Sequence, residues 1–199
     1  MNHSDLIKNI YQSGAVIFED HILMNGDSIP VYIDFRKTLG TPNIYRLIVD
    51  ALWAKIKELK FDYICGLPYG AIPLASMLSI KYNIPMVLLR KIPKNYGTCK
   101  LLDGKVKMGE KILLIDDFIS SGYTMLSALK VLKELNIECF DVAVLIDSKV
   151  GGSALIRSND INVHSVMTLQ DFYISLSKVS PLSLDESLRV KKIIESTLA

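Results

Sequence analysis

Two adjacent carboxylates followed by a turn of small residues are the strongest chemical signal in the chain. They lie in KILLIDDFISSGYT (111–124), where an apolar run predicts a buried strand and the residues after Gly122 predict a helix. Ligands of open α/β sheets bind at the carboxyl ends of strands. Backbone amides and hydroxyls at the start of that helix would hold a phosphate, while Asp116 and Asp117 suit ribose hydroxyls or a metal-bound water. The segment therefore indicates a phosphorylated sugar, although two aspartates that only cap a turn would give the same pattern.

A cationic segment without apolar periodicity lies upstream. RKIPKNYGTCKLLDG (90–104) carries four basic residues around Gly97. Most such charge runs are solvated surface loops, and taken alone this segment is best explained in that way. A basic mobile loop opposite a phosphate cradle is nevertheless what a pyrophosphate leaving group requires, because negative charge develops on it.

The elements that must position these segments are predicted by the hydrophobic pattern. From residue 61 onward, helical segments alternate with the short apolar runs FDYIC, PMVLL, KILLID, CFDVAVLI and INVHSV. This alternation predicts a parallel sheet with helices on its faces, in which KILLID and VAVLI are central strands. Before it we expect a helix at 4–13, a hairpin formed by 15–24 and 29–35, and a helix from Thr41 to Leu59. Two helices, 168–177 and 184–198, end the sequence.

Composition excludes several classes of protein. The 199 residues are 50% apolar with a net charge of only +2, which fits one globular domain and argues against a duplex-binding protein. Three widely spaced cysteines support neither a disulfide framework nor a zinc site, and they indicate a reducing cytosol. The charged N-terminus does not resemble a signal peptide. The uncharged run 63–80 contains Gly and Pro, so we expect no membrane span and a cytoplasmic protein without nucleic-acid partners.

Four segments together resemble a known enzyme family. IDDFISSGYT resembles the phosphoribosyl pyrophosphate (PRPP) binding motif of the type I phosphoribosyltransferases, and RKIPKNYGTCKLLDG resembles the mobile catalytic loop, RKxxKx(H/Y)G, of the orotate phosphoribosyltransferases. FEDHILMNGDSIPVYIDFR (18–36) and ICGLPYGAIPLA (64–75) extend the resemblance over nearly the whole chain. It is most similar to the transferase domain of the bifunctional UMP synthases, and we expect no decarboxylase domain.

The resemblance implies an α/β type I phosphoribosyltransferase fold, a parallel-sheet core with helices on both faces. We expect a single domain (1–199) with a core at 41–166 and a small hood formed by 1–40 and 167–199. The implied reaction forms orotidine 5'-phosphate and pyrophosphate from orotate and PRPP, in de novo pyrimidine (UMP) biosynthesis. The family further implies Mg²⁺ bound mainly through PRPP and water, without metal-ligating side chains, and a homodimer whose loop 90–104 is shared between sites.

The resemblance also implies roles for individual residues. Lys91 and Asp117 are the expected catalytic residues. The PRPP-binding residues implied by the two motifs are Arg90, Lys91, Lys94, Tyr96, Asp116, Asp117, Phe118, Ile119, Ser120, Ser121, Gly122, Tyr123 and Thr124. The base-binding residues implied are Tyr32, Ile33, Tyr69, Ser120 and Ser148.

Two positions depart from the family pattern. Met24 stands where the family has a lysine that contacts PRPP and the base, and Ser148 stands where LDRxxxG has the orotate-binding arginine. Serine cannot form the bidentate clamp that arginine forms with a carboxylate. Three interpretations follow: an orotate enzyme in which Lys149 or another cation replaces the arginine, a phosphoribosyltransferase for a different nucleobase, or a noncatalytic PRPP-binding regulator.

Overall fold

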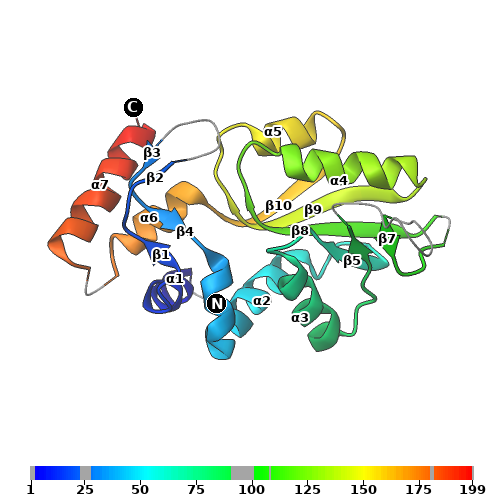
Figure 1. The fold of residues 1–199 in the computed structure, drawn as a ribbon, viewed down its shortest axis with the longest axis horizontal. Helices are drawn as coiled ribbons and strands as arrows, with labels where there is room; N and C mark the ends of the chain where they lie inside the picture. Colours follow the sequence, from blue (N-terminus) through cyan, green and yellow to red (C-terminus); the bar gives the residue numbers. More distant parts are fainter. Residues whose placement is uncertain (1–2, 23–27, 91–100, 108, 180–181, 199) are drawn as a thin grey trace. The chain divides into compact units, whose positions relative to one another are not determined.

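The chain divides into two compact units. The computed structural model describes residues 3–22, 28–90, 101–107, 109–179 and 182–198 (Figure 1). One unit comprises Met1–Ile48 and Met167–Ala199, and the other comprises Val49–Val166. The hood expected at 1–40 and 167–199 belongs wholly to the first unit. Among the described residues, no helix is long and apolar enough to cross a membrane.

The second unit is organised by a four-stranded sheet. Its strand order is β10-β9-β8-β5, with β5 at Tyr63–Gly66, β8 at Lys111–Ile119, β9 at Glu138–Asp147 and β10 at Asn162–Thr168. β8 is parallel to both β5 and β9. The two nearly continuous apolar runs therefore form the central strands, as predicted, because a strand covered on both faces needs apolar side chains in both directions.

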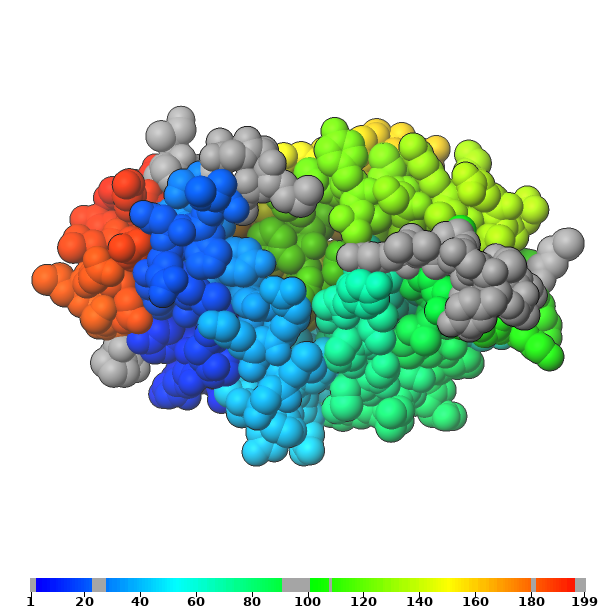
Figure 2. Space-filling view, viewed as in Figure 1, coloured from blue at the N-terminus to red at the C-terminus, as the bar shows by residue number. Residues whose placement is uncertain are grey.

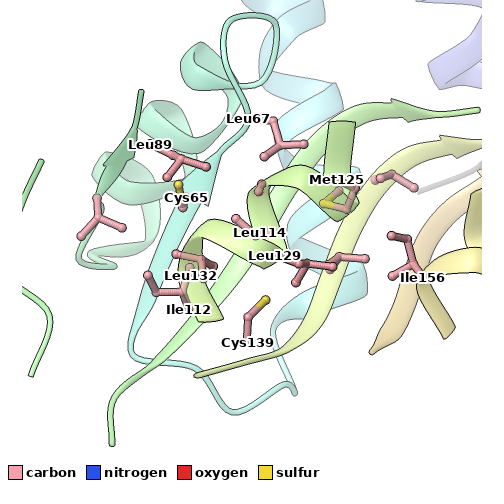
Figure 3. Close-up of a cluster of buried hydrophobic side chains, with 14 of the residues drawn as sticks. Cys65, Leu67, Leu89, Ile112, Leu114, Met125, Leu129, Leu132, Cys139 and Ile156 are labelled. Carbon is pink, nitrogen blue, oxygen red and sulfur yellow. The ribbon is translucent and has the colours of Figure 1, made fainter. Parts of the chain in front are cut away.

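Helices cover both faces of this sheet. α3 (Ile72–Tyr82) packs on β5 and β8, whereas α4 (Tyr123–Glu134) and α5 (Gly152–Arg157) lie over the opposite face (Figure 1). Figure 3 shows the apolar cluster under α4, where Leu129 and Leu132 meet Leu114 of β8 and Cys139 of β9. α5 was not predicted, because six residues are too few for a helical period to be recognised.

The prediction for PMVLL as a full strand of the parallel sheet was wrong. This segment adjoins β5 through a single parallel bridge between Met86 and Ile64. Pro85 has no amide hydrogen to extend that ladder. Leu88–Leu89 (β6) pairs instead with Leu102–Asp103 (β7) in an antiparallel manner. The β6–β7 pair is thus the stem of the basic segment, of which residues 91–100 lie outside the described residues.

The first unit contains the predicted hairpin as two short antiparallel ladders. β1 (Val16–Ile17) pairs with β4 (Tyr32–Ile33), and β2 (His21–Ile22) pairs with β3 (Ser28–Ile29). The remaining elements are α1 (His3–Gln12), the 3₁₀ helix η1 (Phe35–Gly40), α2 (Pro42–Ile56, which crosses the boundary between the units), α6 (Leu169–Leu176) and α7 (Leu184–Leu198).

Two hydrogen bonds join distant parts of the first unit. The buried Tyr173 hydroxyl of α6 donates to the Val31 carbonyl next to β4 at 3.1 Å. The Tyr11 hydroxyl of α1 donates to the Glu186 carboxylate of α7 at 3.2 Å. The C-terminal helices are therefore tied to the N-terminal segment, although more than 100 residues separate them in the sequence.

Candidate functional site

The two aspartates of the motif lie inside β8, not after it. The sequence placed the end of the strand at these carboxylates, but β8 continues to Ile119, which pairs with Asp147 of β9. β8 is longer than predicted because β9 supplies ladder partners as far as Ile119. Side chains alternate between the faces of a strand, so Asp116 and Asp117 start in opposite directions from the backbone.

The helix start that the sequence predicts as a phosphate cradle is at Tyr123, the first residue of α4. Gly122 precedes the helix with a φ of 79°, a left-handed conformation that glycine adopts at low cost. Because glycine has no side chain, it cannot cap the first amides of α4, and the first turn contains no acidic residue. These amides form a site of positive potential that suits an anion. Ser120, Ser121, Tyr123 and Thr124 are exposed around it, whereas the side chain of Ile119 is buried in the core.

A second turn packs directly on this cradle. A Cβ atom on Gly152 would lie 2.0 Å from the Ser120 carbonyl oxygen, and one on Gly122 would lie 2.9 Å from the Gly152 carbonyl oxygen. Only glycine allows the turn after β9 to approach the turn after β8 so closely. The role of Gly152 was not predicted from the sequence. A local signal was present, because VGG (150–152) follows β9 much as SSG (120–122) follows β8.

The loop between β5 and α3 lies against Asp117. A Cβ atom on Gly70 would be 3.2 Å from Oδ2 of Asp117. The preceding residue, Tyr69, is 71% exposed, so its ring is accessible to a ligand. The second unit thus brings together Tyr69, the carboxylates and the cradle, which are all parts of the predicted site.

Burial disfavours the ionised form of Asp116. Removal from water raises the pKa of this carboxyl well above its usual range, and the negative charge of Asp117 raises it further. The Asp117 amide donates to Oδ1 of Asp116 at 3.0 Å but does not offset these effects. Hydroxyl donors from a sugar would favour the ionised form, because they form hydrogen bonds to the charged oxygen atoms.

Asp147, at the end of β9, is buried but has a cationic partner. Its side chain is 1% exposed, and its Oδ2 lies 2.8 Å from the Lys149 Nζ. Burial acts to raise the pKa of Asp147, but hydrogen bonds from the Lys149 side chain and amide and from Ser153 prevail and lower it. The ammonium group of Lys149 is therefore engaged by Asp147, which sequence reasoning did not foresee.

Ser148 directly follows Asp147, the last residue of β9. Its amide donates to the Ile119 carbonyl at 3.0 Å, and its Oγ accepts from the Val150 amide at 3.4 Å. The backbone of the predicted base-binding position thus adjoins the last residue of β8. The other two predicted base-binding residues, Tyr32 and Ile33, belong to the first unit, where Tyr32 stacks on His21 with ring centroids 4.8 Å apart.

Arg90 is the first residue of the predicted basic loop, and the structure describes it. Its guanidinium forms an ion pair with Asp103 across the β6–β7 stem, and its amide donates to the Leu101 carbonyl at 2.8 Å. Lys91, Lys94 and Tyr96 lie outside the described residues, as does Met24.

The described residues contain no cluster of three or more His, Cys, Asp or Glu side chains that could hold a metal ion. Cys65 and Cys139 are free thiols, and burial raises the pKa of Cys65 to about 11 and that of Cys139 to about 12. Both thiols are therefore protonated near neutral pH, and neither is a ready nucleophile.

Comparison with known proteins agrees with this geometry. The model of the phosphoribosyl transferase domain matches residues 37–175. The solved structure of Leishmania donovani UMP synthase superposes with a TM-score of 0.87 at 28% identity, covering 98% of this chain and 43% of that one. Aeropyrum pernix orotate phosphoribosyltransferase superposes with a TM-score of 0.75 at 25% identity, covering 86% and 98%. The fold is that of the type I phosphoribosyltransferases.

Sequence relatives narrow the class. Orotate phosphoribosyltransferase of Chlamydia caviae is 31% identical over 192 residues, which is 96% of this chain and 93% of that protein. Uridine 5'-monophosphate synthase of Bos taurus is 34% identical over 192 residues, but the chain spans only 40% of its length. The chain therefore belongs to the orotate phosphoribosyltransferase family of phosphoribosyltransferase enzymes.

The close approach of the two turns predicts that Gly152→Ala destabilises the protein. The added methyl group would overlap the Ser120 carbonyl, and such overpacking costs typically about 1–3 kcal/mol. Urea denaturation would measure the loss. Gly40→Ala is the matched control, because a Cβ atom there meets nothing within 4 Å. Equal stability of the two variants would show that the turns are not held as closely as described.

The raised pKa of Asp116 predicts that Asp116→Asn stabilises the folded protein at pH 7. The folded state disfavours the ionised carboxyl, so this penalty is present above the folded pKa and disappears below the ordinary value of 3.8. We expect a rise in Tm of about 2–4 °C at pH 7, the shift that roughly 1 kcal/mol produces in a domain of this size. The difference from the unmodified protein should shrink as the pH falls below the folded pKa and vanish only below 3.8. A variant that melts lower at pH 7 would contradict the electrostatic description.

Proposed function

We propose that the chain is an orotate phosphoribosyltransferase, which forms orotidine 5'-phosphate and pyrophosphate from orotate and PRPP in de novo pyrimidine (UMP) biosynthesis. The observation that carries this proposal is the cradle of β8 and α4 beside Asp116 and Asp117, in a chain 31% identical over 96% of its length to a protein of that name. The comparisons give no support to a transferase for a different base or to a noncatalytic regulator.

In the proposed reaction, the cradle holds the 5-phosphate and the two carboxylates hold the ribose hydroxyls. This arrangement fixes the anomeric carbon for attack by a nitrogen of the base. A carbon–nitrogen bond forms with inversion as the carbon–oxygen bond to pyrophosphate breaks, and the bonding electrons leave with pyrophosphate. Arg90 together with Lys91 and Lys94 would neutralise the charge that develops on this leaving group.

We further propose that Mg²⁺ takes part, bound mainly through PRPP and water. No side chain is proposed as a direct ligand of the ion. Asp116 and Asp117, which would hold the ribose hydroxyls, could also accept hydrogen bonds from a metal-bound water. The ion would contribute charge neutralisation at pyrophosphate.

The proposed site differs from the family pattern most clearly where the orotate carboxylate would bind, because Ser148 stands at the position of the family's arginine. Lys149 cannot simply take over the role of the family's arginine, because its ammonium is paired with a buried carboxylate. It would have to bridge Asp147 and the substrate or leave Asp147, which would cost the pairing of a buried charge. Ser148 offers a hydroxyl, a neutral donor, at the position of the arginine.

We propose a cytoplasmic homodimer in which the segment 90–104 of one subunit reaches the site of the other. The Arg90–Asp103 ion pair holds the first basic residue of this segment at the stem, so Arg90 would have to bridge Asp103 and pyrophosphate to act on the leaving group. Neither a nucleic acid nor a membrane is proposed as a partner, since the net charge is only +2.

The proposed activity predicts loss of orotate absorbance when purified protein is mixed with orotate, PRPP and Mg²⁺. Uracil, adenine and guanine assayed in parallel should be inactive. Lys91→Ala should reduce turnover by about 10²–10³-fold with PRPP binding largely retained, since the lysine acts on charge that develops in the transition state. Lys105→Ala, an exposed lysine of the described stem region, is the matched control.

The outcomes of this assay separate the alternatives. Turnover only with another base would identify a transferase of different specificity. PRPP binding without turnover of any base would identify a regulator. Unchanged turnover of Lys91→Ala would remove that residue from the mechanism.

The position of Ser148 predicts that Ser148→Arg improves orotate binding. A restored guanidinium–carboxylate contact should lower the KM for orotate by about tenfold, the effect of a charge-assisted hydrogen bond worth roughly 1.5 kcal/mol. The KM for PRPP should not change. Ser158→Arg, at the exposed far end of α5, controls for added charge. An unchanged or higher KM for orotate would mean that Ser148 does not face the base.

A further inference from the structure

A cavity of about 510 Å³ lies in the second unit, at the end of the sheet opposite to the cradle. It is formed by α4 from Leu126 onward, the turn that follows this helix, the start of β9 and the residues that precede β10. The cradle, in contrast, lies at the first residue of α4 and at the last residues of β8 and β9. The volume falls within the range typical of sites for small molecules.

Half of the residues that line this cavity are apolar, and the other half, which includes Asn136 and Asn159, are polar or charged. Leu129 and Cys139, each 9% exposed, belong both to its lining and to the core cluster under α4 (Figure 3). Leu126, Ile137 and Ile161 line it as half-buried side chains that still offer apolar surface. A ring placed here would exchange contact with water for contact with these side chains.

The rim of the cavity carries a positive excess. Lys130 and Lys133 are three residues apart on α4, so they lie on the same face of the helix. Neither forms an ion pair with any residue that the structure describes. Glu138 is the acidic residue of the lining, which leaves two positive charges against one negative charge.

We propose that this cavity is a second ligand site, which binds a small molecule that has an apolar ring and one negatively charged group. The ring lies on Leu129 and Cys139, and the anionic group meets Lys130 and Lys133. This inference does not rest on the proposed reaction, because it concerns binding at a place that the reaction does not use.

The length of α4 keeps the two sites apart. Lys130 and Lys133, which would meet the anionic group, lie seven and ten residues after Tyr123 at the cradle, about 10 and 15 Å along the helix. Figure 2 shows part of the exposed surface of α4, in yellow-green. A ligand of one site therefore does not occupy the other, and PRPP should not compete for the cavity.

The experiment is a fluorescence titration of the full chain with 8-anilinonaphthalene-1-sulfonate, which has the proposed ring and charge. Lys130→Gln with Lys133→Gln should weaken its binding by about tenfold, the effect of losing two exposed ionic contacts. The neutral N-phenyl-1-naphthylamine should bind both proteins equally. Lys191→Gln with Lys192→Gln, on exposed positions of α7, is the matched control and should leave both affinities unchanged.

A second variant tests the apolar part of the site. Leu126→Trp should fill the cavity and weaken both probes, while saturating PRPP should displace neither. Unchanged sulfonate binding in the double lysine variant would overturn the proposal, and so would displacement by PRPP. The lysine variant changes only exposed side chains, so this test stands even if the tryptophan variant fails to fold. Loss of orotate turnover would leave these binding results unaffected, which separates this inference from the proposed function.

Discussion

The parallel pairing of β8 with β9 is the interaction on which the rest of the site depends. It continues to the last residue of each strand, so Ile119 lies beside Asp147 and the two following turns begin side by side. That proximity makes Gly122 and Gly152 necessary, because their Cβ atoms would overlap backbone atoms of the neighbouring turn. The first amides of α4 remain uncapped because Gly122, which this close contact requires, has no side chain. Local geometry at the cradle is thus a consequence of the ladder between the central strands.

The pKa values of two carboxylates near this end of the sheet are shifted in opposite directions. Asp147 has Lys149 and Ser153 as partners, and its pKa is lowered despite burial. Asp116 has a negative neighbour, and its pKa is raised. The first arrangement stabilises the turn after β9, whereas the second leaves an electrostatic cost that hydroxyl donors of a bound sugar would offset. Functional sites commonly retain such costs, since the groups that bind a ligand are not arranged for stability alone.

Much of this arrangement could be predicted from the sequence, for physical reasons. Alternating apolar runs and helical periods depend on burial alone, which explains why β8, β9 and the start of α4 were identified. Three features depend on how segments pack and turn in space and were not. The extension of β8 to Ile119 depends on the length of β9, the single bridge at Met86 depends on what lies beside β5, and the Asp147–Lys149 pair depends on how the turn after β9 folds. Gly152 had a local signal, the glycine pair after an apolar strand, but its contact with Ser120 was not visible in one sequence.

The claim that the cradle holds the 5-phosphate of PRPP is tested most directly by a crystal structure of the protein with PRPP. The account predicts phosphate oxygen atoms within hydrogen-bond distance of the amides of residues 121–124, and ribose hydroxyls on Asp116 and Asp117. A 5-phosphate bound elsewhere, with the first turn of α4 facing only solvent, would contradict it.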